Sequence, residues 1–293
     1  MTKINHIGWK RIRVLVTNKC NYQCPFCHNE GQSKEHSPMN MSLNDFKTFV
    51  TYLQNEDIEE LHFSGGEPFL NPYIVDMIRF ADDKLSCDIG CATNLSRITD
   101  EQLTLLRGSR VKFNIQFPFA TKEAFKKSTG NGDYDGILKM IEKVRDSGLK
   151  VGLNSVIQSN DTLAIRKLIE FSIKSECPLK LLPQIGLKGS DKFKYVIIPI
   201  VQEYATSYVD KGTGALRWNM EFDGKKTSLL YIDSPCFYND IISCRNFGEI
   251  RINPDFSMQS CILRQPSDKL QIARGKEYVI NQLSELWKNF MTC

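Results

Sequence analysis

Three cysteines near the start of the chain, Cys20, Cys24 and Cys27, are separated by three and then by two residues. Thiolates are soft ligands, and three of them at this spacing can gather round zinc or an iron–sulfur cluster. A structural zinc site is closed by a fourth ligand at short range, and here only His28 follows, with no second Cys-x2-Cys pair nearby. A 4Fe–4S cluster on three thiolates instead leaves one iron open to a non-protein ligand. The pattern therefore favours such a cluster over zinc, and over ordinary surface or core thiols.

The segments around this motif predict how it is held. Residues 11–17 alternate in polarity and are rich in β-branched side chains, which predicts a strand that ends where the cysteines begin. A second strand is predicted at residues 59–64, and it runs into a Gly-Gly-Glu-Pro sequence at residues 65–68. Two glycines before an acid and a proline require a backbone that turns tightly and approaches another group closely. Both loops would then lie at the carboxyl ends of strands.

Strands and helices alternate along the first two thirds of the chain. Further strands are predicted at residues 87–94, 111–117, 148–157 and 179–185, and helices at 42–55, 99–106, 122–128, 134–147 and 164–175. This alternation implies parallel strands with right-handed crossovers. Six such units are too few for an eight-stranded barrel, so the predicted fold is an α/β partial (β/α)6 TIM-like barrel with its active site at the carboxyl ends of the strands. The polar strand ends expected there are Thr93, Asn94, Gln116 and Asn154.

The sequence pattern changes after about residue 190. We therefore expect a barrel over residues 1–190 and a small β-hairpin/helix domain over residues 191–293. Within the second part, strands are predicted at residues 227–232 and 248–253, a turn at 253–256 and an amphipathic helix at 278–290.

The remaining seven cysteines divide into two kinds. Cys87, Cys91 and Cys177 lie in apolar segments and are expected to be buried thiols. Near the C-terminus the others form a second set of possible metal ligands, namely Cys236, Cys244, Cys261 and the last residue, Cys293. A hairpin between Cys244 and Cys261 would bring those two thiols together.

Composition narrows the class of protein. The chain of 293 residues is 41% hydrophobic, enough for a large core, and its net charge of +4 from 38 basic and 34 acidic residues is too slight to indicate nucleic acid as a partner. No apolar run is long enough for a membrane span, and the N-terminus lacks a signal-peptide core. We expect a cytoplasmic protein, in which ten cysteines favour metal or redox chemistry over disulfides.

From about residue 10 to residue 265 the chain resembles the radical S-adenosylmethionine (SAM) enzymes that carry an auxiliary cluster in a twitch or SPASM extension. The nearest pattern is that of GTP 3',8-cyclase of molybdenum-cofactor biosynthesis. The segments that carry the resemblance are residues 20–27, 65–68, 93–94, 114–130 and 148–154, with Cys244, Arg251 and Cys261. The resemblance implies that a 4Fe–4S cluster reductively cleaves SAM to a 5'-deoxyadenosyl radical.

The same resemblance assigns roles to individual residues. It implies that SAM is contacted by Phe26, Gly65, Gly66, Glu67, Pro68, Thr93, Asn94, Gln116, Asn154 and Ile185. It also implies a second 4Fe–4S cluster on Cys236, Cys244 and Cys261, for which Cys293 is a possible fourth ligand. The electron that cleaves SAM would come from a low-potential donor of the flavodoxin or ferredoxin type.

The substrate side departs from the cyclase. His62 stands where the cyclase has an arginine, Gly152 where it has a lysine, and Glu249 where it has the first arginine of an Arg-x-Arg pair. Only Arg251 remains of that pair, so His62 and Arg251 are expected to contact a different substrate. Phosphate recognition needs fixed cationic donors, and these changes argue against GTP.

Three hypotheses follow. The leading one is a radical SAM enzyme acting on a peptide or another small metabolite, although only 19 residues precede Cys20 and leave no room for the leader-binding domain of many peptide-modifying enzymes. The second is a nucleotide cyclase with a re-lined pocket. The third, a non-catalytic Fe–S or zinc protein that carries electrons or acts as a sensor, accounts for the cysteines but not for residues 65–68 or the barrel pattern.

Overall fold

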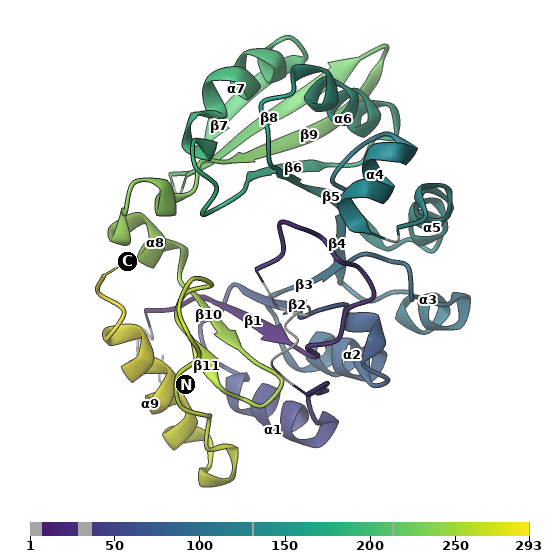
Figure 1. The fold of residues 1–293 in the computed structure, drawn as a ribbon. Helices are drawn as coiled ribbons and strands as arrows, with labels where there is room; N and C mark the ends of the chain where they lie inside the picture. The colour runs from purple at the N-terminus through teal and green to yellow at the C-terminus, as the bar shows by residue number, and fades with distance from the viewer. Residues whose placement is uncertain (1–7, 29–36, 131, 213, 293) are drawn as a thin grey trace.

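The computed structural model describes residues 8–28, 37–130, 132–212 and 214–292. Its strands form one eleven-stranded sheet in the order β11-β10-β1-β2-β3-β4-β5-β6-β9-β8-β7. The sheet curls into a half-barrel, with helices along its outer side and the loop of the first three cysteines on its inner side (Figure 1). This arrangement confirms the predicted α/β partial barrel.

The six strands at the centre of the sheet run parallel to one another. They are β1 (Arg11–Leu15), β2 (Glu60–Ser64), β3 (Asp88–Thr93), β4 (Lys112–Gln116), β5 (Lys150–Ile157) and β6 (Leu179–Pro183). The helices that connect them are α1 (Leu43–Leu53), α2 (Ile74–Lys84), α3 (Asp100–Leu106), α4 (Lys122–Thr129), α5 (Tyr134–Asp146) and α6 (Thr162–Lys174). All but α2 lie where the sequence predicts them.

Local sequence explains where these helices begin and which face they bury. At the start of α3, Thr99 accepts a hydrogen bond from the N–H of Gln102, whose side chain accepts one from the N–H of Thr99, at 3.2 and 3.0 Å. This reciprocal pair satisfies two donors that a helix start otherwise leaves free. The unpredicted helix α2 buries one face at helical spacing, formed by Ile74, Val75, Met77, Ile78 and Ala81.

The C-terminal third of the chain extends the sheet at both edges. At one edge β9 (Lys225–Ile232) pairs in parallel with β6, and β8 (Ala215–Phe222) and β7 (Ala205–Asp210) follow in antiparallel order. At the other edge β10 (Glu249–Ile252) pairs in parallel with β1 and forms a hairpin with β11 (Met258–Gln259). Figure 1 shows these additions at opposite ends of the curled sheet.

The predicted strands and turn of this region are present as β9, β10 and the β10–β11 hairpin, and the predicted last helix is α9 (Lys276–Lys288). Four elements were not predicted: β7, β8, α7 (Lys194–Gln202) and α8 (Ile241–Phe247). β7 escapes a pattern-based prediction because five of its six residues are exposed, so its polarity does not alternate.

The core lies between the outer face of the sheet and the helices. Cys87, Cys91 and Cys177 are buried in it, as predicted. Trp287 of α9 is also buried, which ties the last helix to the core. In the described part of the chain, no helix combines the length and the apolar character that crossing a membrane requires.

Candidate active site

A cavity of about 210 Å³ opens on the inner side of the sheet at the carboxyl ends of β1 to β5. The sulfur-bearing side chains of Cys20, Cys24 and Cys27 line it together. The other lining residues are Tyr22, Phe26, His28, Ser64, Gly65, Gly66, Glu67, Ala92, Thr93, Asn94, Asn114, Gln116, Asn154 and Val156. Of the expected SAM contacts only Pro68, which begins a short 3-10 helix, and Ile185, in the turn after β6, do not line it.

The cysteine loop is held by its own backbone and by apolar contacts. The N–H of Cys27 donates to the carbonyl of Cys24 at 3.1 Å, and the N–H of Tyr22 approaches Cys20 Sγ at 3.4 Å. Tyr22, Cys24 and Phe26 pack into a small buried cluster against Val156 of β5. Burial raises the pKa of Cys20 to about 11 and that of Cys24 to about 12, so metal binding there would release protons.

The two glycines of the second loop allow it to touch the cysteine loop. A Cβ on Gly65, whose φ is +132°, would lie 2.3 Å from the carbonyl oxygen of Thr17. One on Gly66 would lie 1.9 Å from the carbonyl oxygen of Lys19. The N–H groups of Gly66 and Glu67 donate to these two carbonyls at 2.8 and 2.7 Å. The predicted close approach is therefore between the two loops themselves.

Glu67 connects the second loop to the end of β3. Its buried carboxylate accepts hydrogen bonds from Thr93 Oγ1 at 2.7 Å, from the N–H of Asn94 at 2.7 Å and from the N–H of Phe69 at 3.1 Å. Burial raises the pKa of Glu67 to about 7 in spite of these donors. The Asn94 side chain in turn donates to Asn21 Oδ1 at 3.0 Å, which links β3 to the cysteine loop.

Two polar atoms in the wall of the cavity are buried and have no hydrogen-bond partner among the described residues. They are Gln116 Nε2 and Asn154 Oδ1, at paired positions of β4 and β5. Buried polar groups in folded proteins nearly always have partners, so a donor and an acceptor left open side by side indicate a ligand. Three thiols and this polar pair around one space fit a cluster with SAM beside it.

Charged side chains occupy the inner face of the sheet beyond this cavity. His62 lies two residues before Ser64 on the same face of β2, and its Nδ1 is 2.8 Å from Glu60 Oε1. Burial alone would raise the pKa of Glu60, but His62, Arg13 and Lys180 lower it to about 2. Burial lowers the pKa of Lys180 on β6 to about 8, although Glu60 counteracts this.

Arg13 of β1 and Arg251 of β10 also belong to this charged region, and both bind Glu249. Arg13 donates to the Glu249 carboxylate from Nε at 3.0 Å and from Nη2 at 2.9 Å, and Arg251 donates from Nη1 at 3.3 Å. Of this network, only His62 and Arg251 were predicted from the sequence as site residues. Charged residues at every second position of otherwise apolar strands were the signal for the others, because such positions face the inside of a barrel.

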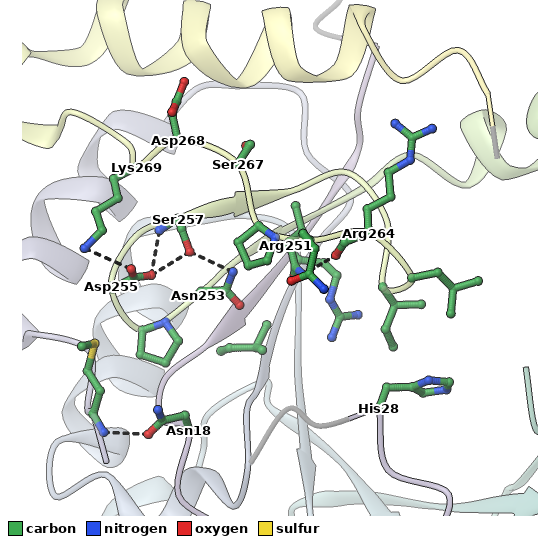
Figure 2. A pocket seen from close by; sticks show the side chains of 18 of the residues that line it. Asn18, His28, Arg251, Asn253, Asp255, Ser257, Arg264, Ser267, Asp268 and Lys269 are labelled. Atoms are coloured by element: carbon green, nitrogen blue, oxygen red, sulfur yellow. Dashed lines mark hydrogen bonds and ion pairs between the residues drawn. The ribbon is translucent and has the colours of Figure 1, made fainter. Parts of the chain in front are cut away.

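A groove of about 790 Å³ lies next to the cavity, between the end of β1 and the β10–β11 hairpin with the loop after it. His28 borders both spaces, and Arg251 lines the groove from β10 (Figure 2). In the hairpin turn, Asp255 accepts hydrogen bonds from the N–H and Oγ of Ser257 at 3.0 and 2.7 Å and forms an ion pair with Lys269 at 3.0 Å. The groove thus has a mixed polar and apolar lining, and hydrogen bonds and an ion pair hold the turn on its far side in place.

The second set of cysteines lies on three separate segments of the C-terminal part. Cys236 lies in a short 3-10 helix, Cys244 in α8 and Cys261 two residues after the end of β11. Cys293 lies outside the described residues. Within residues 8–28, 37–130, 132–212 and 214–292, no three His, Cys, Asp or Glu side chains lie close enough to share a single metal ion, and this holds for Cys20, Cys24 and Cys27 as well as for the second set. A second cluster on these cysteines remains a prediction.

Similarity to proteins of known function agrees with this site. The "Probable GTP 3',8-cyclase" of Saccharolobus islandicus strain L.S.2.15 is 26% identical over 273 residues, which are 90% of this chain and 87% of the relative. The GTP 3',8-cyclase of Clostridium perfringens strain SM101 is 26% identical over 265 residues, 86% of this chain and 80% of the relative.

Solved structures share the fold at lower identity. Streptococcus suis SuiB bound to its precursor peptide SuiA matches 96% of this chain, with a TM-score of 0.69 and 13% sequence identity. This chain covers 65% of SuiB, which is less than two thirds of its length. Native anSMEcpe with bound AdoMet matches with a TM-score of 0.69 at 12% identity over 97% of this chain and 84% of that protein. The family model described as the radical SAM superfamily matches residues 14–172, more than half of the chain. The protein therefore belongs to the radical SAM superfamily of enzymes.

Proposed function

We propose that this radical SAM enzyme acts on a peptide or another small metabolite rather than on GTP. The observation that carries the radical chemistry is the one cavity shared by three thiols and the open polar pair Gln116 and Asn154. Cys20, Cys24 and Cys27 would hold the 4Fe–4S cluster of the superfamily, with SAM against Gln116 and Asn154. When bound, cluster and SAM supply a 5'-deoxyadenosyl radical that abstracts a hydrogen atom.

The neighbouring groove is the proposed substrate space. It borders the SAM cavity at His28, so a substrate in it can place a carbon near the site of radical formation. Its wall includes Arg251, and His62 lies deeper on the same side of the sheet. Where the cyclase pattern has three further cations, this chain has His62, Gly152 and Glu249, which supports a substrate other than a nucleoside triphosphate.

Anaerobic reconstitution tests the proposal. Protein loaded with iron and sulfide is mixed with SAM and dithionite, and 5'-deoxyadenosine is measured with and without GTP. We expect 5'-deoxyadenosine in both mixtures and no nucleotide product from GTP. Absence of 5'-deoxyadenosine from iron-replete protein would contradict the radical assignment, and GTP-dependent conversion would contradict the substrate assignment.

A nucleotide cyclase with a re-lined pocket is the second candidate. Its support is the similarity to cyclases over 90% of the chain at 26% identity. The two candidates separate on nucleotide binding: a cyclase protects GTP-contacting residues from hydrogen exchange when GTP is added, whereas an enzyme for peptides or other metabolites does not.

The auxiliary cluster and its electron supply complete the proposal. Two 4Fe–4S clusters correspond to about eight irons per chain, and about four remain when Cys20, Cys24 and Cys27 are replaced by alanine. In that variant, Cys293→Ser changes the EPR g-values if Cys293 is a ligand and leaves them unchanged if three cysteines hold the cluster. A flavodoxin or ferredoxin is the proposed donor, and it should replace dithionite in the SAM cleavage assay.

A further inference from the structure

Glu249 lies between two arginines on the inner face of the sheet. Arg13 and Arg251 are directly opposite one another in the β1–β10 pair, and Glu249 precedes Arg251 by two residues on the same face. Its carboxylate receives two parallel hydrogen bonds from Arg13, at 3.0 and 2.9 Å, and one from Arg251 at 3.3 Å. The side chains are 22% exposed for Arg13, 16% for Glu249 and 6% for Arg251.

Two guanidinium groups on adjacent strands are a strong site for anions. Each presents a planar set of N–H donors that matches a carboxylate or a phosphate in two-point contact, and low exposure strengthens the interaction. Burial and, next, the charge of Arg13 lower the pKa of Arg251, whereas Glu249 counteracts the effect of burial on Arg13, whose pKa is raised. Such a pair therefore requires a negative group, and here the protein itself provides it.

Charged side chains on other strands face Arg13 and Arg251, and together they determine the net charge inside the half-barrel. Glu60 of β2 is held by His62, and Lys180 of β6 lies within electrostatic range of both Glu60 and Glu249. Three cations, Arg13, Arg251 and Lys180, face two carboxylates, and the exposed Lys112 of β4 lies within electrostatic range of Glu60 and Lys180. With His62 neutral and Lys112 left out because it is exposed, the interior carries one positive charge in excess.

We propose that Glu249 is a specificity-determining residue. Its carboxylate occupies the position between Arg13 and Arg251 that an anionic ligand would otherwise take. Its carboxylate closes this end of the barrel to polyphosphates. The substrate class is then neutral or singly negative, with Lys180 as the cation that remains for one negative group. This assignment rests on the proposed function in taking the neighbouring groove as the substrate space, which reaches the charged network through Arg251.

Inorganic tripolyphosphate is the probe that tests it. Binding is measured by calorimetry to reconstituted protein with SAM, for the wild type and for Glu249→Gln, which keeps the size of the side chain and removes its charge. We expect no saturable binding to the wild type and a gain of at least tenfold in affinity for Glu249→Gln. Glu60→Gln is the matched control, because it also removes an interior negative charge that acts on Arg13, but this carboxylate is hydrogen-bonded to His62 and does not lie between the two arginines. The affinity of this variant for tripolyphosphate should change less than twofold.

Several outcomes would overturn the proposal. Saturable binding of tripolyphosphate to the wild type would overturn it. This measurement needs no variant, so it tests the proposal even if Glu249→Gln does not fold. A folded Glu249→Gln protein without a gain, or an equal gain in Glu60→Gln, would also overturn the proposal. The added change Arg13→Gln should abolish the gain of Glu249→Gln. Formation of 5'-deoxyadenosine by the wild-type preparation is measured separately, so a failure of the proposed function is distinguished from a failure of this assignment.

Discussion

Two regions on the inner face of the sheet differ in how their polar groups are satisfied. At the ends of β4 and β5, Gln116 Nε2 and Asn154 Oδ1 are buried without a partner among the described residues. Deeper on the same face, the carboxylate of Glu249 is bonded to both Arg13 and Arg251. An unpaired buried polar group costs about 1–3 kcal/mol. We therefore expect a ligand to complete the first region, whereas in the second region the carboxylate of Glu249 already has its partners within the protein.

The largest expected effect comes from removing the ligands of the first region. With Cys20, Cys24 and Cys27 all replaced by alanine, no thiolate remains to hold a cluster in the cavity, and 5'-deoxyadenosine formation should fall to background. Iron analysis and the SAM cleavage assay are run on the same preparation. Replacing the buried core thiols Cys87 and Cys177 with alanine controls for the loss of cysteines in general. An equal loss of activity in this control would contradict a specific role of Cys20, Cys24 and Cys27.

Gly66→Ala should disrupt the contact that holds the first region together. The new Cβ would lie 1.9 Å from a carbonyl oxygen of the cysteine loop, so one of the two loops must move. We expect a loss of about 3 kcal/mol in the free energy of unfolding, the upper range for overpacking, and reduced iron incorporation. Gly152→Ala is the control, since its Cβ would lie 3.3 Å from the flexible Lys112 side chain and 3.5 Å, an ordinary contact distance, from the carbonyl oxygen of Pro178. Equal melting temperatures for the two variants would show that the close approach is unimportant.

Glu67 gives the first region a dependence on pH. Burial raises its pKa from 4.5 to about 7, so between these values the folded protein holds a proton that the unfolded chain has released. The stability from this group is present below pH 4.5 and is lost as the pH rises through about 7, by at most about 1.4 kcal/mol per unit. Urea unfolding across this range should show the slope in the metal-free wild type and lose it in Glu67→Gln. Glu101→Gln, at an exposed position of α3, should retain it.

The smallest expected effect tests the open polar pair directly. Gln116→Ala and Asn154→Ala should each weaken SAM binding about fivefold, corresponding to roughly 1 kcal/mol for one hydrogen bond. Ser128→Ala is the matched control, because Ser128 Oγ is also buried without a partner among the described residues but does not line the cavity. Equilibrium dialysis with labelled SAM measures all three, and equal loss in Ser128→Ala would show that the pair is not a ligand contact.

The sequence was informative about the first region because its signals are local. The spacing of Cys20, Cys24 and Cys27 and the glycines at 65 and 66 each lie within a few residues, and strand periodicity places both loops at the same edge. The sequence did not indicate which groups form hydrogen bonds with one another. The carboxylate of Glu67 accepts hydrogen bonds from Thr93 and Asn94, and no spacing in the sequence indicates these contacts.

The charged interior was harder to predict because it depends on long-range pairing. Arg13 meets Glu249 across 236 positions of sequence, and the contact exists only because β10 pairs with β1. β7 and β8 were missed for a similar reason, since their position follows from pairing with β9 rather than from a pattern of their own.

The pairing of β10 with β1 also sets an order of assembly. During synthesis β1 emerges first, but one of its edges stays open until residues 249–252 leave the ribosome, and β6 waits in the same way for β9. Open strand edges invite pairing with other chains, and contacts distant in sequence form slowly. A nascent chain that stalls near residue 190 would thus expose both edges of an incomplete half-barrel, and chaperone capture at that stage would protect it until the final hundred residues cover them.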